Sequence, residues 1–179
     1  MGCHNSKGII PSCRCEQASG TISKSSKKIV QEMWLDLKPE RKNFGISIFI
    51  RLFEEAPEAQ DLFYNFKDLK NQDELLQSLK ELDHVARVMS AFGNCIELLD
   101  DMTQFSDTVQ SLGKAHKKIG INGGHLGLFG KVVLDLLSDH CKSSWTIQKE
   151  KAWKDVFALL TENFEIGLIS EDNNNHVSS

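Results

Sequence analysis

The 179-residue chain has the length of one domain with a sizeable core plus tails. Only three prolines and one tyrosine occur, and Leu, Lys and Glu are abundant, which favours an all-α fold over a β-sandwich. The net charge is −4, but residues 1–28 carry +4 and the remaining residues carry −8. An acidic body argues against a dedicated nucleic-acid binder, so no nucleic-acid partner is expected.

Residues 1–25 predict a disordered basic arm, because Gly, Ser, Lys and Cys dominate them and no apolar periodicity is present. The start Met1-Gly2-Cys3-His4-Asn5-Ser6 matches the pattern for myristoylation of Gly2. Cys3 can take a palmitoyl group, and a second lipid turns marginal membrane binding into stable anchoring. We therefore predict a lipid anchor on Gly2 and Cys3 and a location on the cytoplasmic face of the plasma membrane. An unmodified tail on a cytoplasmic protein is the alternative.

The five cysteines show no spacing typical of a disulfide framework, and neither a secretory signal peptide nor a membrane-spanning apolar run is recognisable. Reducing conditions are therefore expected, in which structural disulfides are rare. Cys95 and Cys141 are interpreted as small apolar groups of the core. A bond between these two cysteines stays open, as does redox activity of either.

The apolar periodicity over residues 26–169 predicts a folded helical domain there. The polar composition of residues 170–179 predicts a disordered tail. Ser25 or Ser26 is expected to cap the first helix, and Pro39 is expected to end it.

Pro39 can also open a second helix that runs through Glu55. Pro57 then begins a short turn of helix that leads to Phe63. The polar stretch 65–75 predicts a loop with room for one short helix. A long helix is expected from about Leu79 to Asp101. Further helices are predicted over 109–119, where Gly120 ends the pattern, over 125–141 and over 147–169.

Two of the six histidines, His84 and His116, lie amid apolar residues of predicted helices. His116 faces the same side as Leu112, because residues four apart are neighbours on a helix. Two histidines on the apolar faces of separate helices can bracket a flat, apolar, metal-containing ligand such as haem. A histidine on such a face is more often a core residue with a backbone partner, so spacing alone leaves both interpretations open. The other histidines are expected in solvent or at a helix end: His4, His125, His140 and His176.

Several residues together make the chain resemble the globin family over residues 26–169, and no single motif carries the resemblance. Within the family the chain is most similar to neuroglobin and, given Met1-Gly2-Cys3, to the lipid-anchored globin X. The resemblance implies about eight helices packed three over three around haem b. It rests on these residues: Trp34, Phe49, Phe63 after Pro57, Leu82-Asp83-His84 with Val88, Ser111-Leu112-Gly113 before His116, and Ala152-Trp153.

The resemblance also implies the role of each site residue. His116 would be the proximal ligand of the iron, and His84 the distal histidine. Phe63 would stack on the porphyrin, and Arg87 would reach a propionate. The remaining walls would be Phe49 and Val88 on the distal side, and Leu112 and Ile121 on the proximal side.

Imidazole chemistry adds two expectations that do not depend on the family. Only the unprotonated ring nitrogen can bind iron, so the other nitrogen of His116 needs an acceptor, and the carbonyl of Leu112 is within reach. His84 can hydrogen-bond an external ligand or ligate the iron itself, and the resemblance to neuroglobin favours the second role.

The implied function is binding of O2, NO and CO at a six-coordinate haem, with a redox or signalling role rather than bulk oxygen transport. Electron transfer with a reductase, nitrite reduction and NO oxidation are the candidate activities, so enzymatic turnover stays open. The competing interpretation is a haem-free, globin-like sensor or adaptor that its acylated arm tethers to a membrane.

Overall fold

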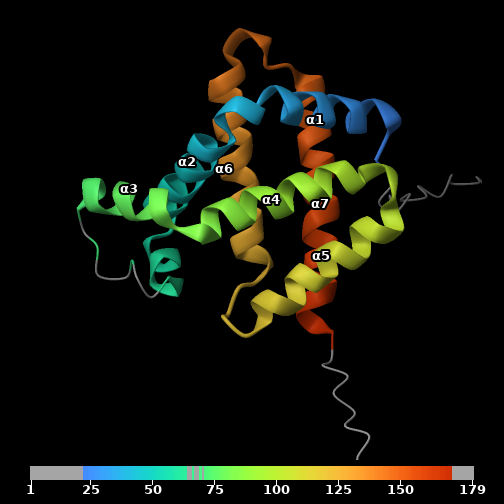
Figure 1. The fold of residues 1–179 in the computed structure, drawn as a ribbon. Coiled ribbons are helices and arrows are strands. Elements are labelled where there is room, and N and C mark those ends of the chain that lie inside the picture. Colours follow the sequence, from blue (N-terminus) through green and yellow to red (C-terminus); the bar gives the residue numbers. More distant parts are fainter. Residues whose placement is uncertain (1–21, 64–65, 67–68, 70, 171–179) are drawn as a thin grey trace, which may run out of the picture.

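The computed structural model describes residues 22–63, 66, 69 and 71–170, and all regular secondary structure within them is helical (Figure 1). No helix in these ranges is long and apolar enough to cross a membrane. The predicted lipid sites Gly2 and Cys3 lie outside the described residues. The α-helices are α1 (Lys24–Asp36), α2 (Arg41–Glu55), α3 (Gln72–Glu81), α4 (Asp83–Glu97), α5 (Met102–Lys117), α6 (Gly123–Cys141) and α7 (Ile147–Ile169). The short 3-10 helices are η1 (Lys38–Glu40), η2 (Pro57–Leu62), η3 (Leu98–Asp100) and η4 (Lys142–Ser144).

Helix α1 begins earlier than the sequence predicts. Ser23 is its N-cap, and the Ser23 hydroxyl accepts a hydrogen bond of 3.0 Å from the backbone N–H of Ser26. The expectation that Ser25 or Ser26 is the cap is therefore wrong. Ser23 is in extended backbone, as a cap requires, whereas the two later serines already lie inside the helix.

The long helix expected from Leu79 to Asp101 is in fact two helices that meet at Leu82. The backbone of Leu82 is extended (φ −77°, ψ 110°), which ends α3 and starts α4. Leu79 belongs to α3, and the loop expected over 65–75 ends at Asn71, which caps α3. Periodicity could not reveal the break, because apolar residues continue on both sides of it.

Helix α5 is longer than the pattern around His116 suggested. It begins at Met102, where Asp101 is the N-cap. The pKa of Asp101 is lowered because the backbone N–H and the side-chain amide of Gln104 donate hydrogen bonds to its carboxylate. After α5 ends at Lys117, Gly120 takes a positive φ of 78°, which glycine adopts without strain.

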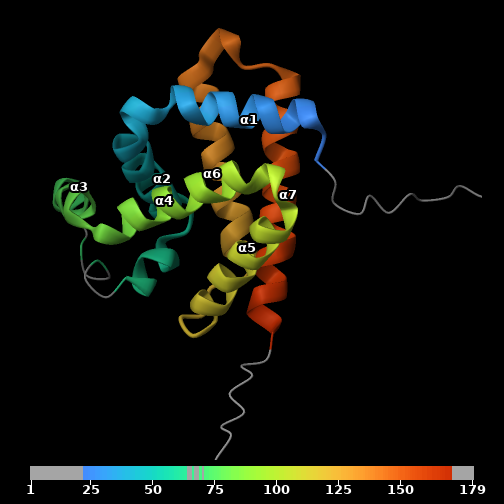
Figure 2. The same cartoon turned by 45° about the vertical axis from the view of Figure 1, so that its right-hand side comes forward.

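Helix α7 is the main packing partner of three other helices. Helices α1, α5 and α6 all contact it, and α2 joins α4 to α6. In both views α4 and α5 run across the front of α6 and α7 (Figures 1 and 2). This arrangement brings the start of α4 and the end of α5 to the same side of the molecule.

The buried apolar residues form two separate clusters. The larger cluster joins α1, α2, α4, α5, α6 and α7 around Trp153 and Phe105. The smaller cluster joins α2, α3 and the start of α4 around Phe49, Phe53 and Phe66. A core that is divided in this way leaves a junction at which a ligand can complete the packing.

Cys95 is buried and Cys141 is half-buried, and both thiols are free. The bond between them that the sequence left open is not formed. Cys95 has the small apolar role expected of it.

Replacing Gly113 or Gly167 with Ala should destabilise the fold by about 1–3 kcal/mol. A Cβ atom at Gly113 would overlap the carbonyl oxygen of Phe164, and one at Gly167 would overlap the carbonyl oxygen of Gln110. Gly127→Ala in α6 is the matched control, because open space surrounds that position; helix propensity should make it neutral or stabilising by up to about 1 kcal/mol. Urea unfolding of the three variants measures the difference, and equal midpoints would contradict the close approach of α5 to α7.

Cys95 should react slowly with iodoacetamide in the folded protein. Burial raises the pKa of the Cys95 thiol to about 11, so at pH 8 it carries roughly a hundredfold less thiolate than an ordinary cysteine. Its alkylation rate should rise about tenfold per pH unit up to that pKa. Mass-spectrometric mapping across a pH series measures the rate, with urea-unfolded protein as the control; equal rates in the two states would refute the prediction.

Candidate functional site

The fold brings His84 and His116 together from two different helices. His84 lies in the first turn of α4, and His116 lies in the last turn of α5. Their ring centres are 6.5 Å apart, and the ring planes are inclined by 58°. The two candidate ligands that are 32 positions apart in the sequence are thus neighbours in space.

This separation fits one metal ion held between the rings. A bond from a metal to an imidazole nitrogen is about 2 Å long, and that nitrogen is ~1 Å from the ring centre, so two opposed rings have centres roughly 6 Å apart. The observed 6.5 Å is close to this value. Porphyrin nitrogens supply four ligands to iron, so two imidazoles complete its coordination.

His116 is oriented by a hydrogen bond to its own helix. Its Nδ1 lies 2.8 Å from the carbonyl oxygen of Leu112, one turn earlier. Because a carbonyl can only accept, Nδ1 must carry the proton, and Nε2 keeps a free lone pair. This is the tautomer that a metal ligand requires, and the acceptor is the one the sequence predicted.

His84 belongs to the side of the smaller core cluster. Its ring centre is 5.9 Å from that of Phe49 and 5.5 Å from that of Phe63. The pKa of His84 is lowered, first by burial and then by repulsion from Arg87 and His116. His84 is therefore neutral near pH 7, the form in which imidazole ligates metals.

Among the predicted walls, Phe49 and Phe63 lie beside the ring of His84, and the carbonyl of Leu112 accepts the hydrogen bond of His116. Phe63, Val88, Leu112 and Ile121 are half-buried, and Phe49 is buried. Phe63 and Val88 pack on the smaller core cluster, whereas Leu112 and Ile121 pack on the larger one. Apolar side chains that flank a facing pair of imidazoles suit a flat, apolar ligand such as a porphyrin.

Arg87 is exposed, one turn after His84 on the same helix. It is close enough to lower the pKa of His84 by repulsion. An exposed guanidinium beside the histidine pair would be able to bind a propionate at the ligand's edge, as the resemblance implies.

Sequence reasoning did not single out Phe164 as a site residue. Its ring centre is 5.6 Å from that of His116, so a residue of α7 packs against the candidate ligand on α5. The sequence showed Phe164 only as one more residue of an apolar helix face, because its contact with His116 depends on how α5 crosses α7.

The other described histidines have structural roles. His125 is half-buried and forms a capping box with Asn122 at the start of α6, a structural role that the sequence analysis did not assign to it. His140 is exposed near the end of α6, and its Nδ1 lies 3.8 Å from a carboxylate oxygen of Glu40.

The chain is similar in sequence and in fold to several known proteins. A neuroglobin of Danio rerio is 27% identical over 139 residues, which cover 78% of this chain and 87% of the relative. Cytoglobin-1 of Oryzias latipes is 25% identical over 145 residues, which cover 80% of this chain and 82% of the relative. Among solved structures, a protein described as a hexacoordinated heme protein from an anhydrobiotic tardigrade, crystallised at pH 4, shares the fold. Its TM-score is 0.75 at 19% identity, over 84% of this chain and 97% of that chain.

The family pattern for globins matches residues 46–164, well over half of the chain. The all-α globin fold that the resemblance implies is thereby confirmed. Both facing histidines lie within the matched range. The chain therefore belongs to the globin family and is a haem-binding globin.

Proposed function

We propose that His116 and His84 hold the iron of haem b from opposite sides, so that the resting globin is six-coordinate. The observation that carries this proposal is the 6.5 Å between the two ring centres. The description of the tardigrade protein as hexacoordinated supports it.

Haem supplies, when bound, a site for O2, NO and CO and one-electron redox chemistry. The protein's own part is to position the ligating nitrogen and to exclude water. His116 keeps its Nε2 available through the hydrogen bond to Leu112. Phe49, Phe63 and Val88 keep the distal side apolar and restrict water.

A small ligand reaches the distal side when His84 moves away, and the local structure favours that motion. His84 lies in the first turn of α4, next to the helix break at Leu82, and no side chain caps this helix start. First turns without a cap open more easily than helix interiors. Ligand affinity is therefore reduced by the fraction of molecules in which His84 has moved.

The redox role follows from the same pair of imidazoles. When both stay in place, the protein rearranges little as an electron enters or leaves. Electron transfer, nitrite reduction and NO oxidation are consequently better suited to this site than bulk oxygen transport, and each requires a reductase as partner.

We also propose that the N-terminal arm is acylated at Gly2 and Cys3 and holds the globin at the cytoplasmic face of the plasma membrane. The arm's sequence supports this proposal. The arm leads into α1, whose first residues include exposed Lys24 and Lys28. Cations next to a lipid anchor strengthen binding to anionic membrane surfaces.

His84→Leu should convert the ferrous protein from a six-coordinate to a five-coordinate spectrum. Loss of the competing imidazole should raise the apparent affinity for CO by about tenfold or more. Visible absorption and CO titration measure both effects. His140→Leu is the matched control, because His140 lies at the exposed end of α6. A six-coordinate spectrum that persists in His84→Leu would remove His84 as a ligand.

His116→Ala separates the haem proposal from the adaptor interpretation. Purified wild-type chain should show a strong Soret band, and His116→Ala should lose most of it. A folded wild-type protein that stays colourless with added hemin would leave only the haem-free sensor or adaptor.

Intact-mass analysis of protein from a eukaryotic cell tests the anchor. Myristate on Gly2 and hydroxylamine-sensitive palmitate on Cys3 are expected, and Gly2→Ala should abolish membrane sedimentation. Its control is Gly8→Ala, which leaves the acyl acceptor intact. A free or acetylated amine on Gly2 would disprove the anchor.

A further inference from the structure

The outer face of α7 carries a charge pattern that neither the core nor the haem site uses. Seven exposed residues form it, and we call them the α7 stripe. They are Ile147, Lys151, Lys154, Ala158, Glu162, Glu165 and Ile169.

The α7 stripe is a palindrome centred on Ala158. Residues four and seven positions before Ala158 are lysines, and residues four and seven positions after it are glutamates. Eleven positions away on either side lie Ile147 and Ile169, which are 86% and 78% exposed. At 3.6 residues per turn, all seven side chains lie within about 40° of the direction of Ala158.

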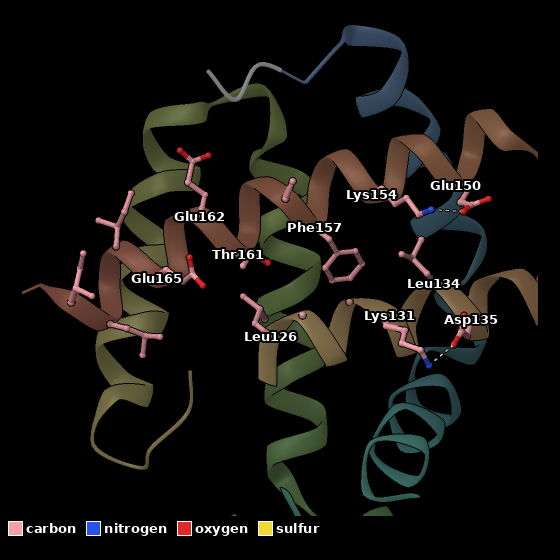
Figure 3. Close-up of a pocket in the computed structure, with 16 residues that line it drawn as sticks. Leu126, Lys131, Leu134, Asp135, Glu150, Lys154, Phe157, Thr161, Glu162 and Glu165 are labelled. Atoms are coloured by element: carbon pink, nitrogen blue, oxygen red, sulfur yellow. Dashed lines mark hydrogen bonds and ion pairs between the residues drawn. The ribbon is translucent and has the colours of Figure 1, made fainter. Parts of the chain in front are cut away.

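A groove between α6 and α7 adjoins the stripe (Figure 3). Its volume is about 1210 Å³, and Leu126, Leu134 and Phe157 contribute apolar surface to it. Figure 3 shows Lys154 towards one end of α7 and Glu162 and Glu165 towards the other. The groove therefore combines apolar surface with Lys131, Asp135, Glu150 and Lys154 towards one end and Glu162 and Glu165 towards the other.

The charges of the α7 stripe are only partly satisfied within the chain. Lys154 Nζ is 2.6 Å from Glu150, and Lys151 Nζ is 2.7 Å from Asp155. Glu162 makes no ion pair or hydrogen bond within the part of the chain that the structure describes. Its carboxylate is free to pair with another molecule.

We propose that the α7 stripe docks onto the same stripe of a second copy of this chain, with the two α7 helices antiparallel. A two-fold axis through Ala158 pairs each residue of one copy with a residue of the other copy. The two paired residues lie the same number of positions from Ala158, one before it and one after it. Lys154 then meets Glu162 of the other copy, Lys151 meets Glu165, and Ile147 meets Ile169. Each contact occurs twice, as a two-fold interface requires.

The charge pattern favours a second copy over other occupants. A membrane surface or nucleic acid would favour one sign of charge along the face, whereas the α7 stripe has both signs in equal number. Only a partner with the reversed order of charges matches, and an antiparallel copy has that order.

The dimer should be reversible. One helix of 23 residues is about 35 Å long, so α7 alone covers less than the roughly 800 Å² per partner of a standard interface. Ala158 lets the two backbones approach closely at the axis. Exposed ion pairs are weak and screened by salt, so high salt should dissociate the dimer.

Charge reversal tests the pairing in the full-length haem-loaded protein under reducing conditions. Sedimentation equilibrium up to about 1 mM, the weak end of specific association, should show a monomer–dimer equilibrium for the wild type. Lys154→Glu and Glu162→Lys should each weaken it at least about tenfold, because each variant places like charges opposite one another at two symmetric points. Ala158→Arg should also weaken it by blocking the axis.

Mixing the two charge variants gives the sharpest readout. The Lys154→Glu variant has Glu at positions 154 and 162, and the Glu162→Lys variant has Lys at both positions. Each homodimer is therefore repulsive, whereas a heterodimer of the two variants has two complementary charge pairs and should form. The double variant Lys154→Glu/Glu162→Lys should recover wild-type dimerisation. Lys38→Glu, an exposed charge reversal outside α7, should have no effect, and the Soret band should stay unchanged throughout.

Two results would overturn the proposal. One is a wild type that stays monomeric over the whole concentration range. The other is a dimer that both single charge variants and Ala158→Arg leave unaffected, which would assign self-association to a different surface.

Discussion

The close crossing of α5 and α7 is the contact on which the rest of the site depends. Gly113 and Gly167 each face backbone of the other helix with no room for a Cβ atom. His116 lies three residues after Gly113, so this crossing also sets the ring of His116 beside Phe164. Packing at the crossing thus determines where the α5 ligand points, and the hydrogen bond to Leu112 determines which nitrogen it offers.

The surroundings of His84 differ from those of His116. His84 follows the break at Leu82, and its ring contacts those of Phe49, Phe63 and His116. In the proposed six-coordinate state, His84 is the ligand placed to move away, because it follows the helix break at Leu82. The two histidines also pack on different core clusters. His84 contacts the smaller cluster through Phe49 and Phe63, whereas His116 contacts the larger one through Phe164.

Helix α7 serves two purposes on opposite faces. Its buried face carries Trp153, Phe157 and Phe164 and organises the core. Its exposed face carries the α7 stripe, in which two lysines precede Ala158 and two glutamates follow it at the same spacings. Intramolecular packing constrains only the first face, so the second is free to encode recognition of another chain.

The sequence by itself determined the all-α class, the bounds of α7 and the end of α2. It also singled out His84 and His116 as candidate ligands of the iron. All of these depend on local patterns of apolar residues, prolines and histidines. Only the tertiary structure decided that the two histidines face one another at 6.5 Å, that Phe164 supports one of them and that α3 and α4 are separate helices. The physical reason is that helical periodicity records which face of a helix is buried. It does not record where a helix breaks between apolar residues, or against which helix that face will pack.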